Sequence, residues 1–216
     1  MSDHTATDRH ESSERLAQQL LSLLSVRWES HAMQRRVVGV AGESGSGKSM
    51  TADGLARACS SVGMRALVLN QDNYFFLPPR TNHEHRIESL DNVGVHEVNL
   101  AMIGSHIAAF RARENGVAAP LVDYPGNRFV TQTLDFADVE LLIVEGTYVL
   151  QLDDLDVRIF LEATHEDTEE RRRVRNRDID APIVAQVLAI EHEIIARQRA
   201  VADLLIDSDF RLTRSW

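Results

Sequence analysis

The sequence predicts an α/β fold with an open, mostly parallel sheet and helices on both faces, and three observations carry this prediction. Short, β-branched apolar runs alternate with stretches of helical periodicity along the 216 residues. These runs are continuously apolar, as in strands that are buried on both faces of a parallel sheet. A glycine-rich stretch joins the first run to the next helical stretch, at the kind of edge where such sheets bind ligands.

The N-terminal segment, residues 1–34, is expected to hold a flexible polar tail and one amphipathic helix. Residues 1–13 show no apolar periodicity, so they predict the tail. The helix is expected over residues 14–28, where apolar side chains recur at helical spacing: Leu16, Leu20, Leu23, Leu24 and Trp28. This stripe predicts packing on the core or on a second subunit, so a homo-oligomer stays open.

The rest of the chain, residues 35–210, is expected to form one domain of ordinary size. The predicted strands cover residues 35–41, 64–70, 119–129 (a strand and then a turn), 139–146, 156–162 and 204–206. The predicted helices cover residues 48–62, 97–113, 164–177 and 183–203. Residues 71–96 are rich in Asn, Pro and His and predict an irregular segment, which at this length is typical of a functional region.

Composition and charge argue against several classes of function. The net charge of −10 is unlike that of general nucleic-acid-binding proteins, which need a basic surface. No apolar run approaches the roughly 20 residues of a membrane span, and the first residues show no signal-peptide pattern. The single cysteine, Cys59, allows no intrachain disulfide. We therefore expect a cytoplasmic protein without membrane or nucleic-acid partners, and a structural role for Cys59.

The stretch GESGSGKS, residues 42–49, fits the G-x-x-x-x-G-K-[ST] pattern of a phosphate-binding loop, or P-loop. Glycines let the backbone curl so that successive N–H groups face one anion, and the following helix adds its positive end. The Lys48 ammonium is suited to the β- and γ-phosphates, and the Ser49 hydroxyl to Mg²⁺. The pattern predicts a P-loop NTPase-type fold and a nucleoside-triphosphate site formed by Gly42, Glu43, Ser44, Gly45, Ser46, Gly47, Lys48, Ser49 and Met50.

Three carboxylates lie at the carboxyl ends of predicted strands, namely Asp72, Asp123 and Glu145. In open α/β sheets ligands bind beyond these ends, so the three side chains are expected at the edge that carries the P-loop. One of them is suited to accept a proton from an attacking hydroxyl, and another to hold Mg²⁺ or its waters. A solvated loop position is the alternative for each, and it weighs most for Asp123.

Two further stretches are candidates for chemistry. ERRRVRNRD, residues 170–178, places five arginines within seven residues of an acidic protein. It predicts a lid near residues 164–180 that brings arginines over a transferring phosphoryl group, with a solvated helix carrying i,i+4 ion pairs as the alternative. NHEH, residues 82–85, has metal-like spacing, but Mg²⁺ prefers oxygen ligands. A substrate contact by one of these histidines or by Arg86 is therefore favoured over a metal site.

These features together resemble the uridine kinase and phosphoribulokinase family of P-loop kinases, from near residue 36 to near residue 207. The resemblance rests on GESGSGKS, LNQDNYF, DYPGNR, IVEG, the arginine-rich segment and a late helix that runs into ADLLID. It implies ATP and Mg²⁺ as cofactors. It also implies Asp72 as the base on the acceptor hydroxyl, Tyr74 near the acceptor, and Glu145 as a residue that helps to place the metal.

The same resemblance implies Tyr124 and Arg128 as nucleoside contacts, and Arg172 and Arg173 as the lid arginines. The expected function is ATP-dependent transfer of the γ-phosphoryl group to a hydroxyl of a small molecule, with uridine or cytidine as leading acceptors. Tyr124 is suited to stack on a ring, and Arg86 or Arg128 to bond a carbonyl edge. Pantothenate, a sugar and adenylylsulfate stay open as acceptors.

A regulatory GTPase is the main rival class. DYPG, residues 123–126, fits the D-x-x-G pattern of a segment that senses a γ-phosphate. Against this class, the chain has no Asn-Lys-x-Asp motif to read guanine.

Overall fold

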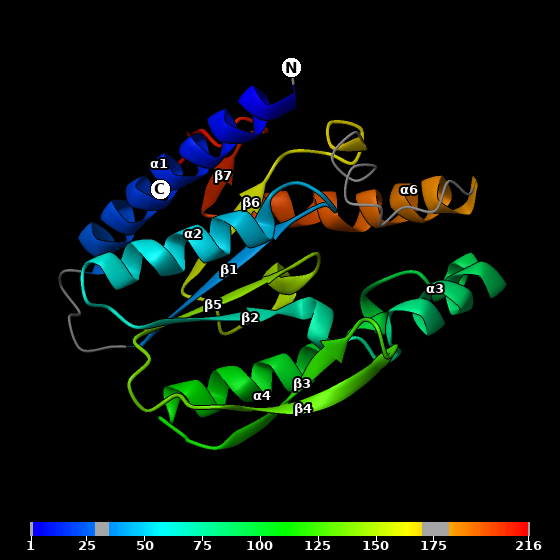
Figure 1. Cartoon of the computed structure of the whole chain (residues 1–216), viewed down its shortest axis with the longest axis horizontal. Helices are drawn as coiled ribbons and strands as arrows, with labels where there is room; N and C mark the ends of the chain where they lie inside the picture. Colours follow the sequence, from blue (N-terminus) through cyan, green and yellow to red (C-terminus); the bar gives the residue numbers. More distant parts are fainter. Residues whose placement is uncertain (1, 29–34, 170–181, 216) are drawn as a thin grey trace.

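The computed structural model of the protein describes residues 2–28, 35–169 and 182–215 and has an open six-stranded sheet covered by helices (Figure 1). The strand order is β2-β5-β1-β6-β7-β8. The strands are β1 (Arg36–Gly42), β2 (Ala66–Asn70), β5 (Leu141–Gly146), β6 (Val157–Leu161), β7 (Leu204–Ile206) and β8 (Leu212–Arg214). Neighbouring strands pair in parallel except for β7 and β8, so the predicted fold class is confirmed.

The central strands are apolar along their length because both faces of the sheet are covered. Every residue of β5 and six of the seven in β1 are buried. On one face, α1 (Ser2–Trp28) and α2 (Lys48–Ser61) pack on the sheet through a cluster that includes Leu16, Leu20, Leu24, Leu55, Val38, Val40 and Ile143. The leucine stripe of α1 therefore belongs to the core of its own chain.

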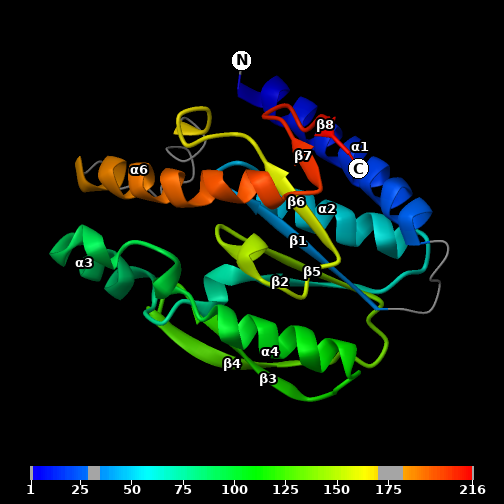
Figure 2. The same ribbon diagram turned by 180° about the vertical axis from the view of Figure 1, so that it is seen from behind.

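The opposite face carries a second core cluster under α4 (Leu100–Arg111) and the end of α6 (Pro182–Ala196). Its members include Ile103, Ile107, Phe110, Phe136, Leu142, Val144 and Ile195. Seen from behind, α4 lies across the sheet from α1 (Figure 2). Within the described residues, none of the helices has both the length and the apolar character that crossing a bilayer requires.

The N-terminal helix begins at Ser2, so the prediction of a flexible tail over residues 1–13 is wrong for the part that is described. Extending a helix adds one hydrogen bond for each residue that becomes ordered, so a packed helix can continue through polar sequence. The ion pair between His10 and Glu14, with Nδ1 and Oε1 at 3.6 Å, lies at i,i+4 spacing on this extension. Hydrophobic periodicity alone does not mark such a helix start.

The predicted strand at 119–129 is the larger correction. β3 (Val117–Asp123) and β4 (Arg128–Leu134) form a separate antiparallel two-stranded sheet, outside the main sheet. The chain reverses directly after β3, and Asn127 helps by adopting a left-handed φ of 46°. Strands joined by such a short turn pair antiparallel, because a parallel pair needs a long crossover.

Residues 71–96 are more regular than expected. They contain η2 (Gln71–Tyr74), α3 (Pro79–Glu88), η3 (Leu90–Asn92) and most of η4 (Val95–Glu97). Helix α3 begins with proline at its first position, which favours a helix start, but it has no apolar stripe to reveal it in the sequence. Short 3₁₀ segments also occur at η5 (Val149–Gln151) and η6 (Arg197–Val201).

Two other predicted helices have different bounds. Helix α4 begins at Leu100 and not at residue 97, because the Asn99 side chain caps it by accepting from Met102 N at 3.0 Å. In the helix predicted over 164–177, residues 165–168 form turns, and residues 170–177 lie outside the described part of the chain.

Candidate active site

The glycine-rich loop connects β1 to α2 at the carboxyl edge of the sheet, as its motif predicts. Gly47 precedes α2 with φ 107°, a conformation that side-chain-bearing residues rarely adopt. A Cβ at this position would lie 2.6 Å from the Phe210 ring, so glycine is required for space as well. At the start of α2, Lys48 Nζ donates to the carbonyl oxygen of Glu43 at 2.9 Å. The loop therefore holds its ammonium group close to the backbone that would surround a phosphate.

An oxygen-rich site lies beside this loop. The Ser49 hydroxyl donates to Glu145 Oε1 at 3.0 Å, across from α2 to β5. Burial raises the pKa of the Glu145 carboxyl; the nearby Lys48 ammonium opposes this rise and the Asp72 carboxylate adds to it. A cation would relieve the repulsion between the two carboxylates. The hydroxyl and carboxylate oxygens form the donor set that Mg²⁺ prefers, so these residues fit the ion that the motif implies.

The strand order brings Asp72 to the same place. β5 lies between β1 and β2, so the residues that follow β2 stand next to the end of β5. Asp72 follows in η2, where its backbone N–H donates to Asn70 Oδ1 at 2.7 Å. Gln71 is buried and bridges the two strands: Nε2 donates to Thr147 Oγ1 at 2.8 Å, and Oε1 accepts from Tyr148 N at 2.8 Å. Gln71 was not predicted as a site residue, because nothing in its type or spacing distinguishes it from an exposed glutamine.

A cavity of about 470 Å³ opens next to Asp72. Its lining residues are Asp72, Phe75, Leu77, Pro79, Asn82, Arg86 and Tyr124. Six of these seven come from residues 71–96, the segment whose length was typical of a functional region. Tyr124 comes from the turn between β3 and β4, and its hydroxyl donates to Asp72 Oδ2 at 3.4 Å. Asp72 is therefore shared between the cavity and the edge of the sheet that carries the P-loop.

One wall of the cavity is a buried ion-pair cluster around Arg86. Arg86 Nε donates to Glu97 Oε1 at 2.5 Å, and Nη2 donates to Glu97 Oε2 at 2.9 Å and to Glu191 Oε1 at 3.0 Å. Asn82 Nδ2 also donates to Glu97 Oε1, at 2.8 Å. Burial opposes the charge on Arg86, but the bonds to Glu97 and the nearby Glu191 raise the pKa of Arg86 overall. The cluster joins α3, η4 and α6, and its two glutamates were not predicted.

Tyr74, which was expected near the acceptor, is not among the described residues that line the cavity. Its side chain is buried in the core under α4, and its hydroxyl lies 2.8 Å from His106 Nδ1. Burial raises the pKa of Tyr74 and lowers that of His106. Tyr74 thus serves the packing of η2 and not the wall of the pocket.

The hairpin that carries Asp123 and Arg128 is not part of the main sheet, so Asp123 does not end a main-sheet strand as expected, and the nucleoside contact of Arg128 stays a prediction. Arg128 Nε donates to Asp123 Oδ2 at 2.9 Å across the turn, and Gly126 N donates to Asp123 Oδ1 at 3.1 Å. The Gly126 N–H and the Arg128 guanidinium hold the pKa of Asp123 below its usual value. Neither residue is among the described lining of the cavity.

Three other sequence features have mixed outcomes. Arg172 and Arg173 lie outside the described residues, so the lid stays a prediction. The NHEH stretch, residues 82–85, had metal-like spacing. Its Asn82 donates a hydrogen bond to Glu97, and the described group of residues with metal-binding geometry is formed by other residues. Cys59 is fully buried in α2, and burial raises the pKa of its thiol to about 11, in agreement with a structural role.

Comparison with known proteins identifies several distant relatives, although no protein-family model matches the chain. A bifunctional alpha-galactosidase/sucrose kinase of Mediterraneibacter gnavus is 27% identical over 198 residues, which is 85% of this chain and 21% of the relative. The chain thus spans only about a fifth of that relative's length. A uridine kinase of Leuconostoc citreum is 24% identical over 192 residues, which is 79% of this chain and 86% of the relative.

Solved structures share the fold. A putative fructose transport system kinase of Silicibacter sp. TM1040 covers 86% of this chain and 93% of its own, with a TM-score of 0.61 and 22% identity. Phosphoribulokinase of Rhodobacter spheroides covers 81% of this chain and 70% of its own, with a TM-score of 0.60 and 15% identity. With these structural neighbours and several uridine kinases among its distant sequence relatives, the chain is similar to the uridine kinase/phosphoribulokinase-like P-loop kinases, in agreement with the resemblance of its motifs.

Proposed function

We propose that the protein transfers the γ-phosphoryl group of ATP to a hydroxyl group of a neutral small molecule. The observation that carries this proposal is the position of Asp72, whose carboxylate borders the cavity and also lies close enough to influence Glu145 beside the P-loop. A hydroxyl in the cavity and a phosphate at the loop would therefore meet at one carboxylate.

On the donor side, the loop amides and Lys48 would hold the phosphates. Lys48 Nζ now donates to a loop carbonyl, and it would turn to the β- and γ-phosphates when ATP is bound. Ser49 and Glu145 would hold Mg²⁺, which when bound neutralises phosphate charge. Arg172 and Arg173 are proposed to close over the transferring group and to stabilise its charge.

On the acceptor side, Asp72 would orient the hydroxyl and accept its proton as the oxygen attacks phosphorus. The Tyr124 hydroxyl, 3.4 Å from Asp72 Oδ2, would help to hold the carboxylate in that orientation. The hydrogen bond from Asp72 N to Asn70 and the Gln71 bridge fix the backbone beneath it. Asp72 therefore needs little rearrangement to act as the base.

The charge of the cavity favours a neutral acceptor. Its described lining holds one cation, Arg86, which is already paired with Glu97 and Glu191, and one acid, Asp72, which accepts a hydrogen bond from the neutral Tyr124 hydroxyl. An anionic acceptor such as pantothenate or adenylylsulfate would meet this acid without a compensating described cation. The rings of Phe75 and Tyr124 offer flat apolar surfaces for a base or for a sugar face.

A pyrimidine nucleoside, uridine or cytidine, is the first candidate, and the resemblance to uridine kinases supports it. A sugar is the second candidate, because two of the relatives carry names of sugar kinases: the sucrose kinase of Mediterraneibacter gnavus and the fructose system kinase of Silicibacter. Both candidates present a primary hydroxyl and no charge. They differ in whether a planar base is needed for stacking.

The test is an acceptor panel with purified protein and Mg·ATP, read by ADP release and by the mass of the product. The panel contains uridine, cytidine, sucrose, fructose, pantothenate and adenylylsulfate. We expect acceptor-dependent ADP formation with a neutral compound, and at least a ~10²-fold lower rate in Lys48→Met, which loses one electrostatic stabiliser. Turnover only with an anionic acceptor would overturn the charge argument. Hydrolysis of GTP in the absence of any acceptor would contradict the kinase proposal and favour a regulatory GTPase.

A further inference from the structure

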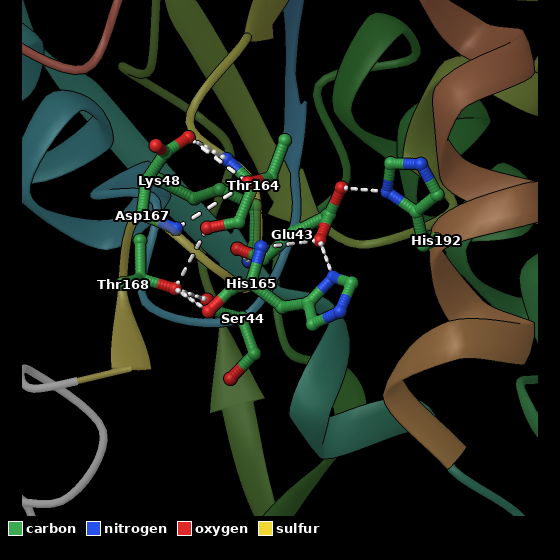
Figure 3. A network of polar contacts seen from close by, with 8 residues as sticks. All are labelled: Glu43, Ser44, Lys48, Thr164, His165, Asp167, Thr168 and His192. Atoms are coloured by element: carbon green, nitrogen blue, oxygen red, sulfur yellow. Dashed lines mark hydrogen bonds and ion pairs between the residues drawn. The ribbon is translucent and has the colours of Figure 1, made fainter. Parts of the chain in front are cut away.

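Two histidines approach one carboxylate of the P-loop (Figure 3). None of these three residues is among the described lining of the cavity, and none belongs to the Ser49–Glu145 pair. His165 Nδ1 lies 3.0 Å from Glu43 Oε2, and His192 Nδ1 lies 2.7 Å from Glu43 Oε1. One ligand atom from each of the three residues lies within 4.8 Å of the others. The two imidazole rings approach the carboxylate from different sides (Figure 3).

The three residues come from three separate elements. Glu43 follows β1, His165 follows β6, and His192 stands on α6. Glu43 is only 5% exposed, whereas the side chains of His165 and His192 are 22% and 37% exposed. The carboxylate is therefore held inside the protein, while the imidazole side of the cluster is open to solvent.

Local hydrogen bonds hold His165 in this place. Thr164 donates to Asp167 Oδ2 from its backbone N at 2.8 Å and from Oγ1 at 2.9 Å, which closes the turn that carries His165. Thr168 Oγ1 then donates to the carbonyl oxygen of Ser44 at 2.9 Å and ties this turn to the P-loop (Figure 3). The backbone N–H of His165 itself donates to Glu43 Oε2 at 2.6 Å. The cluster is thus supported by contacts that do not involve the imidazole rings.

We propose that Glu43, His165 and His192 form a binding site for a divalent transition-metal ion, with Zn²⁺ as the leading candidate. Two histidine nitrogens and one carboxylate form a recurrent donor set of zinc sites that keep a fourth position open. Mg²⁺ and Ca²⁺ prefer oxygen ligands, so this site is chemically distinct from the oxygen donors at Ser49 and Glu145. It also does not depend on which acceptor the kinase uses.

To receive the ion, the imidazole rings must shift, because the two histidines contact different oxygens of Glu43 and the three ligand atoms are within 4.8 Å of one another. At Zn–N and Zn–O distances of about 2.0–2.2 Å, tetrahedral ligand atoms stand about 3.3 Å apart. The two N–O separations of 3.0 and 2.7 Å are a few tenths of an ångström shorter. Each Nδ1 must offer its lone pair to the ion, so the proton that it donates to Glu43 moves to Nε2 or is released to solvent.

A bound ion would connect the phosphate-binding loop to the segment after β6 and to α6. The loop residue Glu43 carries the carbonyl group that Lys48 contacts, so the ion would act next to the donor site without replacing Mg²⁺. We expect it to stabilise the folded chain, because an ion that binds only the native state raises the free energy of unfolding.

The test is titration of the metal-free full chain with Zn²⁺ against a chromophoric chelator, in excess Mg²⁺ so that oxygen sites are filled. We expect one tight equivalent, a rise in the melting temperature, and a visible absorption band when Co²⁺ replaces Zn²⁺. His165→Ala and His192→Ala should each lower Zn²⁺ affinity by more than the ~10–100-fold that loss of an outer hydrogen-bond partner costs. His96→Ala, which removes an exposed histidine outside the cluster, is the matched control.

Melting curves in the presence of a chelator establish that each variant is folded, and both side chains are exposed enough to be removed without a large cavity. Two outcomes would overturn the proposal. One is the absence of a tight equivalent in the wild-type chain, which would leave the cluster as a hydrogen-bonded link between loop and helix. The other is an equivalent that persists in the double variant His165→Ala, His192→Ala, which would place the ion elsewhere.

Discussion

The donor side and the acceptor side of the site are constructed in different ways. At the donor side, one continuous stretch supplies the loop, and the ends of β1 and β5 meet there because they are hydrogen-bonded neighbours. At the acceptor side, α3, η4, α6 and a separate hairpin converge through side chains that are far apart in sequence. The donor side thus depends on backbone conformation, whereas the acceptor side depends on tertiary contacts. Substitutions at the donor side should therefore affect mainly the catalytic rate. Substitutions at the acceptor side should affect folding or acceptor binding.

The largest expected effect is on the rate of Asp72→Asn, at the boundary of the two sides. Asparagine keeps the size of the side chain but does not accept the proton, so kcat should fall by ~10²–10⁴-fold with ATP affinity retained. Steady-state kinetics measure the change in kcat, and a nucleotide-binding assay measures the affinity for ATP. The matched control is Asp123→Asn, which alters an acid of the hairpin outside the cavity and should keep a near-normal rate. Loss of ATP affinity in Asp72→Asn would instead assign this carboxylate to the metal.

The next effect is on stability, and it tests the acceptor side alone. Arg86→Met removes the cation between two buried carboxylates, which should cost about 3–5 kcal/mol of the free energy of unfolding. Denaturant unfolding measures this change. Arg128→Met removes an exposed ion pair with Asp123 and should change stability by no more than about 1 kcal/mol. Equal losses in the two variants would contradict the distinction between the buried cluster and the exposed turn.

The smallest effect concerns Tyr124, which links the hairpin to Asp72. Tyr124→Phe keeps the ring but loses the 3.4 Å hydrogen bond, so we expect a decrease in kcat of only a few-fold. Tyr124→Ala also removes the ring and should raise the acceptor KM by ~2–12-fold, the scale of one aromatic contact. Comparing the two variants separates stacking from carboxylate positioning. An unchanged KM in the alanine variant would mean that the acceptor does not contact this ring.

The same contrast explains what could be predicted from the sequence. The order of strands and helices and the position of the P-loop follow from short-range patterns, and the residue pair Ser49 and Glu145 is close in the structure as the motif implied. Asp123 was misplaced because β3 has the apolar character of a main-sheet strand, and only its short turn to β4 takes it out of that sheet.

Buried polar residues that contact each other across the fold were the second feature that the sequence did not predict. Glu97 and Glu191 were not identified because the cation that both of them bind, Arg86, lies 11 and 105 residues away from them along the chain. Tyr74 was expected at the acceptor, but the packing of α4 brings His106 to its hydroxyl. Such pairings depend on the three-dimensional arrangement of helices, and no spacing within a single chain segment records them.

The separate hairpin has a consequence for how this fold can diversify. Its base packs on the core cluster under α4 through Ala119 and Leu134, whereas its turn end is tied to α3 and η2 by polar bonds. Examples are Arg80 N to Asn127 Oδ1 at 2.8 Å and Val122 N to Asn73 Oδ1 at 2.9 Å. None of its residues hydrogen-bonds into the main-sheet ladder, because its strands pair only with each other. Insertions or exchanges in this hairpin can therefore alter one wall of the pocket while the nucleotide-binding scaffold is inherited unchanged. Related proteins can therefore differ in their acceptor through changes at the turn of this hairpin, while the P-loop and the main sheet stay the same.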